Sequence, residues 1–407
     1  MTDDVSLTTQ TAYAELLDRC QTAVFRTEFA PSGGFVRVAV KGRDYWYFQQ
    51  GARDETGRQK RKYVGPDTPE LRLRIAAHQQ AKDDYRERRH LIATLRRAGF
   101  QSPPDRIGAI LAALAAAGVF RLRACLVGTA AYQAYGPMLG VRLPHATLQT
   151  GDIDIAQFTS VSVAIAADEQ VPSLLEALQR AEPSFRAVPH LTAGVAAAYV
   201  DAGGFRVDVL TENRGPEQAA PIALPALGTH AVPLRFLDFL LYEDVPAALL
   251  HDAGIAVNVP APARYAVHKL ILAQRRREGM AKSDKDLKQA EALIAALARR
   301  RPHDLRAAWR EAWGRGRQWR RLVATGLGMI APGARDRALH VLGAARDIVP
   351  GQELRFADAP ARENVADRTV MFEGRNGPEG VLCRISREAL EDHFGANGRT
   401  RTGRLDS

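Results

Sequence analysis

Two neighbouring aspartates, Asp152 and Asp154, are the side chains of this sequence best placed to do chemistry. They alternate with Ile153 and Ile155, and in a β-strand residues i and i+2 lie on the same face. Both carboxylates are therefore expected on one face, with both isoleucines in a core. Adjacent carboxylates repel each other, and a cation between them relieves that repulsion. Oxygen ligands of this kind suit Mg²⁺, which proteins hold through one or two carboxylates and substrate phosphates.

A third aspartate, Asp208, lies in the apolar segment 205–210 after a Gly-Gly turn, and this segment predicts a second strand. If the two strands pair, the three carboxylates converge on one edge of a sheet, as two-metal phosphoryl or nucleotidyl transfer requires. On the Asp-x-Asp pattern alone, an alternative is that Asp152 and Asp154 are solvent-facing residues of an amphipathic edge strand.

The segment 124–135, upstream of both strands, predicts a short buried strand, a tight turn at Gly128 and Thr129, and a helix. A glycine permits close approach of the backbone, and the hydroxyl and N–H groups at a helix start can hold a phosphate. The alternative is an ordinary strand-to-helix turn in which Thr129 caps the helix.

In this order, the three segments resemble the nucleotidyltransferase superfamily that includes DNA polymerase β. The resemblance rests on Gly128-Thr129 at a helix start, on Asp152 and Asp154, and on Asp208 between two valines. It implies an α+β fold with a polymerase-β-type core, in which helices flank a mixed sheet. It also implies that the three aspartates are catalytic and bind two Mg²⁺ ions, and that Gly128 and Thr129 bind the phosphates of a nucleoside triphosphate.

The sequence departs from the family pattern in two places. The stretch between Gly128 and Asp152 is longer than in minimal members, and 137–147 is expected to be an inserted loop. Thr129 stands where many members carry serine, but the hydroxyl is kept.

The resemblance continues through two predicted helices, 262–272 and another beginning at Lys285. They are similar to the helical half of bacterial standalone nucleotidyltransferases, which include toxins of abortive-infection and toxin–antitoxin systems. That similarity implies that Lys269 faces the nucleotide phosphates, that the acceptor is RNA such as a tRNA 3′ end, and that an antitoxin protein is a partner. The alternative for Lys269 is a solvated lysine on a helix face.

Positive charge is concentrated in two parts of the chain, which carries a net charge of +10. Lysine and arginine number 16 against 8 acidic residues over 37–97, and 17 against 6 over 264–321. Basic surfaces attract nucleic acid through its phosphates. The alternative is solubility combined with the arginine bias of a GC-rich genome.

Several negative signals bound the class of protein. No apolar run approaches the length of a membrane span, and the start lacks the basic and apolar regions of a signal peptide. The 3 cysteines are widely separated and form neither a metal-spacing motif nor a disulfide framework. A cytoplasmic protein without a membrane partner is expected.

The N-terminal region predicts a three-stranded meander over 35–40, 45–48 and 57–65, followed by a charged helix over 70–97. Basic residues interleaved with aromatic ones could grip a single nucleic-acid strand by stacking. Alternatively, the sheet is small and its aromatics pack on the next helix. The helix is expected to be a solvated arm.

The C-terminal end is expected to be a separate module, because 369–372 and 381–385 predict a hairpin and 387–394 a helix, with a disordered tail from 397. This ending resembles a small bacterial domain of unknown function. Four parts are predicted in all: the basic meander and helical arm over 1–104, the catalytic core over 105–260, the basic helical domain over 261–348, and the hairpin-helix module over 349–407.

The sequence therefore predicts a Mg²⁺-dependent enzyme that transfers a nucleoside monophosphate from a nucleoside triphosphate, such as ATP, to an acceptor hydroxyl. Two alternatives remain at this stage. One is adenylyl transfer to a protein or a small molecule. The other is a non-catalytic protein that binds nucleotide or nucleic acid, against which the three intact aspartates argue.

Overall fold

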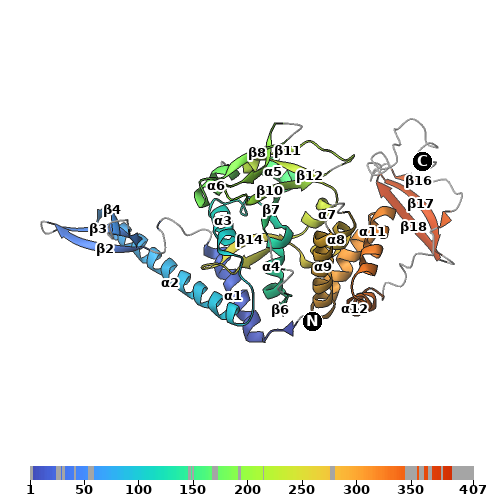
Figure 1. The fold of residues 1–407 in the computed structure, drawn as a ribbon, viewed down its shortest axis with the longest axis horizontal. Helices are drawn as coiled ribbons and strands as arrows, with labels where there is room; N and C mark the ends of the chain where they lie inside the picture. The colour runs from blue at the N-terminus through green and yellow to red at the C-terminus, as the bar shows by residue number, and fades with distance from the viewer. Residues whose placement is uncertain are drawn as a thin grey trace. The chain divides into compact units, whose positions relative to one another are not determined.

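The computed structural model describes residues 3–23, 29, 33–40, 43–53, 59–144, 148, 151–166, 173–190, 194–213, 215–275 and 280–343, and four strands between 355 and 386. The chain forms two compact units, 1–341 and 342–407 (Figure 1). The second unit thus begins a little before the predicted boundary between 348 and 349. The subdivision of the first unit at 104/105 and 260/261 stays a prediction.

A 7-stranded mixed sheet lies at the centre of the first unit. Its strands are β5 (Cys125–Val127), β7 (Asp152–Ala156), β8 (Arg186–Pro189), β9 (Ala196–Val200), β10 (Arg206–Glu212), β11 (Ile222–Leu224) and β12 (Thr229–Leu234). The main path runs β11-β12-β10-β7-β5, while β9 pairs with β10 and β8 with β9. Strand β10 is parallel to both β7 and β12, and the other pairs are antiparallel. This mixed sheet with flanking helices agrees with the predicted α+β class.

Short helices and strands surround the sheet. They are α3 (Asp105–Ala116), α4 (Gly128–Leu139), α5 (Thr159–Ala166), α6 (Leu174–Ala181), η2 (Pro225–Leu227), α7 (Leu237–Leu241), and the hairpin of β13 (Asp244–Leu249) and β14 (Ile255–Pro260). The predicted loop over 137–147 is wrong at its start. Helix α4 continues to Leu139, Gly140 turns the chain in the left-handed conformation with φ 67°, and β6 (Val141–Arg142) follows and pairs with β1 (Asp3–Asp4). The residues 145–147 lie outside the described part.

Among the described residues, five helices follow the hairpin: α8 (Pro262–Arg275), α9 (Met280–Arg300), α10 (Pro302–Gly314), α11 (Arg317–Met329) and α12 (Pro332–Gly343). The two predicted helices are confirmed as α8 and α9, although α9 begins at Met280, ahead of the predicted Lys285. Helix α11 approaches α8 so closely that a Cβ added at Gly326 would collide with the backbone of Leu270. A glycine therefore sets the distance between these two helices.

The N-terminal meander is confirmed as β2 (Gly34–Val40), β3 (Arg43–Arg53) and β4 (Gln59–Pro66), in the order β2-β3-β4. It is joined to α2 (Pro69–Arg97), which begins with Thr68 accepting a hydrogen bond from the Leu71 N–H at 3.2 Å. An additional helix, α1 (Leu7–Ala23), precedes the meander.

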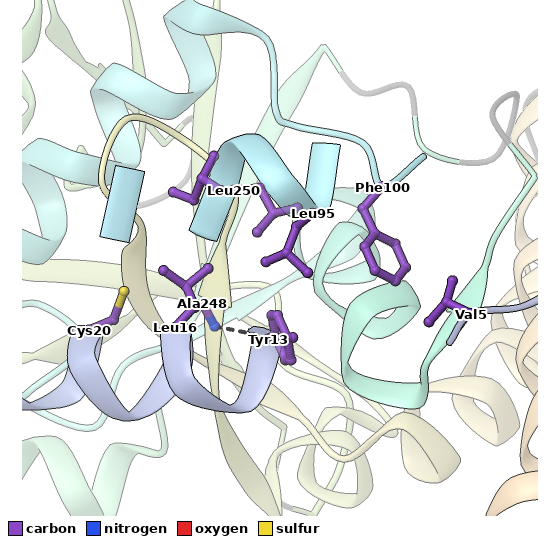
Figure 2. Close-up of a cluster of buried hydrophobic side chains, with 9 residues drawn as sticks. Val5, Tyr13, Leu16, Cys20, Leu95, Phe100, Ala248 and Leu250 are labelled. Carbon is purple, nitrogen blue, oxygen red and sulfur yellow. Dashed lines mark hydrogen bonds between the residues drawn. The ribbon is translucent and has the colours of Figure 1, made fainter. Parts of the chain in front are cut away.

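Helix α2 is only partly the solvated arm that its charge predicts. Its last turns pack with α1 and the β13–β14 hairpin in a buried hydrophobic cluster (Figure 2). The buried members are Val5, Tyr13, Leu16, Cys20, Ile92, Leu95, Phe100, Ala248 and Leu250. Burying a side chain such as Leu95 stabilises the fold by roughly 1.5–3 kcal/mol. The arm is therefore anchored by residues far from it in the sequence.

The second unit contains a 4-stranded antiparallel sheet of β15 (Arg355–Phe356), β16 (Arg362–Asn364), β17 (Thr369–Asn376) and β18 (Glu379–Ser386). Strands β17 and β18 confirm the predicted hairpin. The predicted helix over 387–394 and the tail lie outside the described residues. Within the described part of the chain, no helix combines the length and the apolar character needed to cross a bilayer.

Candidate active site

The pairing of β7 with β10 brings the three aspartates together on one face of the central sheet, where these two strands begin. The strands are parallel, with Asp154 opposite Asp208 and Asp152 opposite Arg206. The intervening Ile153 and the residues of β10 between the polar positions are fully buried. The predicted alternation and the predicted pairing of the two strands are both confirmed. The edge-strand alternative is wrong, because β7 lies between β10 and β5.

A buried aspartate, Asp201, holds the turn from which β10 starts. Its Oδ1 accepts hydrogen bonds from the backbone N–H groups of Gly203 at 2.9 Å and Phe205 at 3.0 Å, and Arg106 of α3 pairs with its other oxygen. Burial acts to raise the pKa of Asp201, but the hydrogen bonds from Phe205 and Arg106 outweigh it and lower that pKa. Asp201 was not among the predicted residues, although an aspartate two residues before a Gly-Gly pair is a turn signal.

The Asp208 carboxylate is half-buried and pairs with Arg206 two residues earlier on the same strand face. Its two oxygens lie 2.8 and 2.9 Å from the Arg206 Nε. Burial raises the pKa of Asp208, and the nearby Asp152 carboxylate acts in the same direction. Arg206 and Lys282 oppose that rise, so both cations lie within electrostatic reach of Asp208. Neither cation was among the predicted site residues.

Gly128 places the backbone of the strand-to-helix turn directly against Asp154. It adopts the left-handed conformation with φ 65°, and a Cβ at this position would collide with the Asp154 Oδ2. The helix cap is Val127, which makes no side-chain capping bond. The alternative in which Thr129 caps α4 is therefore wrong. Phosphate binding by Gly128 and Thr129 stays a prediction.

Two residues of the helical part hold this turn in place. The hydroxyl of Tyr265 on α8 lies 2.9 Å from the Gly128 carbonyl oxygen and 3.0 Å from Oε1 of Gln289 on α9. The Nε2 of the same buried glutamine lies 3.4 Å from the Thr129 Oγ1. The turn is thereby fixed between the sheet and the helices. Tyr265 and Gln289 carry no signal in the sequence, because single polar residues in apolar helices are common.

Lys269 lies beneath the same turn in a buried ion pair. Its Nζ is 2.6 Å from the Asp286 Oδ1, with 5% and 4% of the two side chains exposed, and it lies 5.2 Å from the centre of the Tyr265 ring. The alternative of a solvated lysine is therefore wrong. Contact between Lys269 and a nucleotide phosphate stays a prediction.

The part of the chain that carries this candidate site matches a known protein family. A family of nucleotidyltransferases matches residues 105–314, just over half of the chain. The chain belongs to this nucleotidyltransferase family. The match begins at the first residue of α3 and ends at the last residue of α10. It therefore includes the three aspartates, the Gly128 turn and the helices that hold it, and the protein is a nucleotidyltransferase.

Other comparisons with this nucleotidyltransferase are distant. No curated protein matches it significantly. Among solved structures, it is similar to an antigenic nucleotidyltransferase-like protein from Paracoccidioides brasiliensis, with 13% identity over 55% of this chain and 94% of that chain. The TM-score of 0.26 is too low to support a conclusion about the fold.

The resemblance implies a divalent cation at the aspartates of this enzyme. Within the described residues, no group of three or more His, Cys, Asp or Glu side chains is gathered tightly enough to hold a metal ion. Asp208 is instead engaged by Arg206. Even so, the residues fit a hard cation: all three are oxygen donors, and the Asp152 carboxylate already disfavours ionisation of Asp208. A cation would have to displace the Arg206 guanidinium from Asp208.

Proposed function

We propose that this nucleotidyltransferase uses Mg²⁺ and transfers a nucleoside monophosphate from a nucleoside triphosphate, such as ATP, to a hydroxyl of RNA, for example a tRNA 3′ end. The observation that carries the proposal is the β7–β10 register, which sets Asp208 opposite Asp154. The Gly128 turn lies against the same carboxylate. Residue types that suit metal ligands therefore lie beside the turn that would bind the phosphates.

Asp152, Asp154 and Asp208 are the residues that would hold two Mg²⁺ ions. When bound, such ions neutralise phosphate charge and lower the pKa of an attacking hydroxyl. Burial already disfavours the charged form of Asp208, which suits a carboxylate that accepts a proton during the reaction.

The transfer itself forms one bond and breaks one bond. The acceptor hydroxyl oxygen attacks the α-phosphorus, a new oxygen–phosphorus bond forms, and the bond from the α-phosphorus to the bridging oxygen breaks. Pyrophosphate leaves, and the hydroxyl proton passes to the Asp208 carboxylate. The backbone N–H groups at the start of α4, at Gly128 and Thr129, would stabilise the negative charge of the phosphates.

Two lysines are candidates to neutralise charge on the triphosphate. Lys269 would have to exchange Asp286 for a phosphate oxygen, and in the meantime it supports Tyr265 and the Gly128 turn. Lys282 is exposed near the start of α9 and acts electrostatically on Asp208. It therefore reaches the site without breaking a buried pair.

The RNA acceptor follows from the basic character of 37–97 and 264–321. The resemblance to standalone toxin-type nucleotidyltransferases supports a cytoplasmic protein with an antitoxin partner. The C-terminal unit resembles a bacterial domain of unknown function, and we assign it no role in the transfer.

The test is incubation of the full-length protein with each α-labelled nucleoside triphosphate, Mg²⁺, and either total cellular RNA or total protein. Label is expected in RNA, with loss of labelling for Asp154→Asn and for Asp208→Asn. The matched control is Asp252→Asn, an exposed carboxylate in the turn after β13, in a left-handed conformation that asparagine tolerates. Label in protein or a small molecule would replace the RNA acceptor, and no label in any fraction would leave a nucleotide-binding protein.

A further inference from the structure

We infer that one face of the N-terminal meander docks single-stranded RNA, an inference that rests on the RNA acceptor of the proposed function. This tyrosine face is defined by Arg43, Tyr45, Tyr47, Arg61 and Tyr63. The family match begins at residue 105, so the whole face lies outside it.

The opposite face of the meander packs on helix α2. The rings of Phe35 and Phe48 lie 5.2 and 5.6 Å from the ring of His78, in edge-to-face contact. Phe48 and His78 are both buried, and Lys82 of α2 donates a hydrogen bond to the Gly33 carbonyl at 2.9 Å. The phenylalanines are thus used for packing, as the alternative in the sequence analysis predicts.

The tyrosines lie on the other face. Alternation along β3 points Tyr45 and Tyr47 away from the side of Phe48, and the register sets Tyr63 directly opposite Tyr47. The ring of Tyr63 is 6.2 Å from that of Tyr45 and 5.5 Å from that of Tyr47. Tyr63 is 52% exposed. Three neighbouring rings are therefore presented together, and packing on α2 does not account for them.

Positive charge stands at both ends of this tyrosine row. Arg43 precedes Tyr45 by two residues on the same strand face, and Arg61 lies opposite Gln49, two residues beyond Tyr47. Both arginines are exposed. Within the three described strands Asp44 is the one acidic residue, and it is paired with Arg37. The face therefore offers cations for phosphates, and the one carboxylate of these described strands is already paired and alternates to the other face.

The tyrosines and arginines of this face together fit one kind of ligand, a single strand of nucleic acid. Aromatic side chains bind nucleic acid by stacking on the faces of bases, and only unpaired bases present those faces. Arginines at the ends of the row suit the phosphates of the same strand. A duplex would satisfy the arginines but would leave the tyrosines without partners. The face therefore fits a single strand, and the proposed acceptor makes that strand RNA.

The experiment measures binding of the full-length protein to a fluorescent single-stranded RNA by anisotropy, without nucleoside triphosphate, over a series of salt concentrations. Tyr63→Ala is expected to weaken binding about five- to hundredfold, whereas Tyr63→Phe keeps the ring and stays within about twofold of the original affinity. Arg43→Gln with Arg61→Gln is expected to reduce the slope of log affinity against log salt by about 1.4.

The matched control is Arg86→Gln with Arg89→Gln, which removes the same charge from α2, where both side chains are 62% exposed. It is expected to keep the salt slope. The inference is overturned if Tyr63→Ala binds like the unaltered protein, or if duplex RNA of the same sequence binds as tightly. It is equally overturned if sedimentation shows that Tyr63→Ala dissociates a dimer while RNA affinity is unchanged.

The outcome separates this inference from the proposed function. Transfer of label to RNA that is as efficient with Tyr63→Ala as with the unaltered protein would reject the tyrosine face and keep the RNA acceptor. Tyr63-dependent RNA binding without any transfer of label to RNA would keep the face and reject the proposed acceptor.

Discussion

Strands β7 and β10 carry polar side chains at both ends, but those at one end are partly exposed and those at the other are buried. At the end where these strands begin, Asp152, Asp154 and Asp208 are partly exposed, and Asp152 makes ionisation of Asp208 harder. At the other end, Thr211 and Glu212 of β10 are buried.

The far end is held by hydrogen bonds among its own groups. The Thr211 Oγ1 lies 2.8 Å from the Gln157 carbonyl oxygen and 2.7 Å from the Glu212 Oε2. The backbone N–H of Thr159 donates to that same carboxylate oxygen at 3.1 Å. Buried polar groups with such partners stabilise one arrangement of the strands.

The two ends of these strands are therefore expected to have different roles, one in stability and one in activity. Partnered polar groups at the far end fix where β7 and β10 lie. Like charges at the near end oppose folding, and such groups are typical of functional sites. The near end should therefore control activity and the far end stability, which the following substitutions test.

The largest effect is expected for Asp154→Asn. Nucleotidyl transfer should fall by at least about a hundredfold, because a charged group of the proposed reaction centre is lost. The free energy of unfolding should not fall, because one of the repelling carboxylates is removed. Single-turnover labelling and urea denaturation measure the two quantities. Unchanged transfer, or transfer that persists in excess chelator, would place the chemistry elsewhere.

Next is the buried pair behind the Gly128 turn. Lys269→Met should destabilise the protein by roughly 3–5 kcal/mol, because Asp286 would be left as a buried charge without its cation. The double substitution Lys269→Met with Asp286→Leu should recover much of that loss. Urea denaturation of the two variants checks this, and a single variant as stable as the original would show that the pair contributes nothing.

Addition of Mg²⁺ should stabilise the protein only through the aspartates at the near end, where β7 and β10 begin. At a free concentration of about 100 times the Kd, binding to the folded state should add about 2.7 kcal/mol to the free energy of unfolding. Asp154→Asn should abolish the gain and Thr211→Val should keep it. Thermal denaturation with and without chelator measures the effect, and an equal gain in all three proteins would indicate a cation site outside the aspartates.

The smallest effect is expected at the far end. Thr211→Val should lower the free energy of unfolding by roughly 1–3 kcal/mol, because the single hydroxyl proton that either the Glu212 carboxylate or the Gln157 carbonyl accepts would be lost. Transfer per folded molecule should be unchanged. A loss of transfer without a loss of stability would contradict the division between the two ends.

Local patterns of the sequence were sufficient for several elements. The alternation of Asp152 and Asp154 with isoleucines predicted β7, and the aromatic and basic alternation after residue 35 predicted the meander. Both succeed because a strand has a period of two residues, which a few neighbouring positions reveal. The left-handed turn at Gly128 was also foreseeable, since glycine adopts that conformation without a steric penalty.

Other expectations failed because they depended on distant segments. The charge of α2 indicated a solvated arm, but Ile92 and Leu95 are buried against α1 and the β13–β14 hairpin. The alternative of a solvated lysine on α8 also failed, because Lys269 is buried and paired with Asp286 on the next helix. The composition of a segment shows which residue types it contains. It does not show which distant segment will bury them.

The sequence by itself determined the family, the residue types of the candidate site, and the strand faces on which Asp152, Asp154 and Asp208 lie. It could do so because backbone periodicity and glycine conformation are local properties. Only the tertiary structure decided that Asp154 and Asp208 stand opposite each other, that Tyr265 and Gln289 hold the Gly128 turn, and that the tyrosines of the meander lie on the face away from α2. Register and packing are set by contacts between residues far apart in the chain, so no window of the sequence contains them.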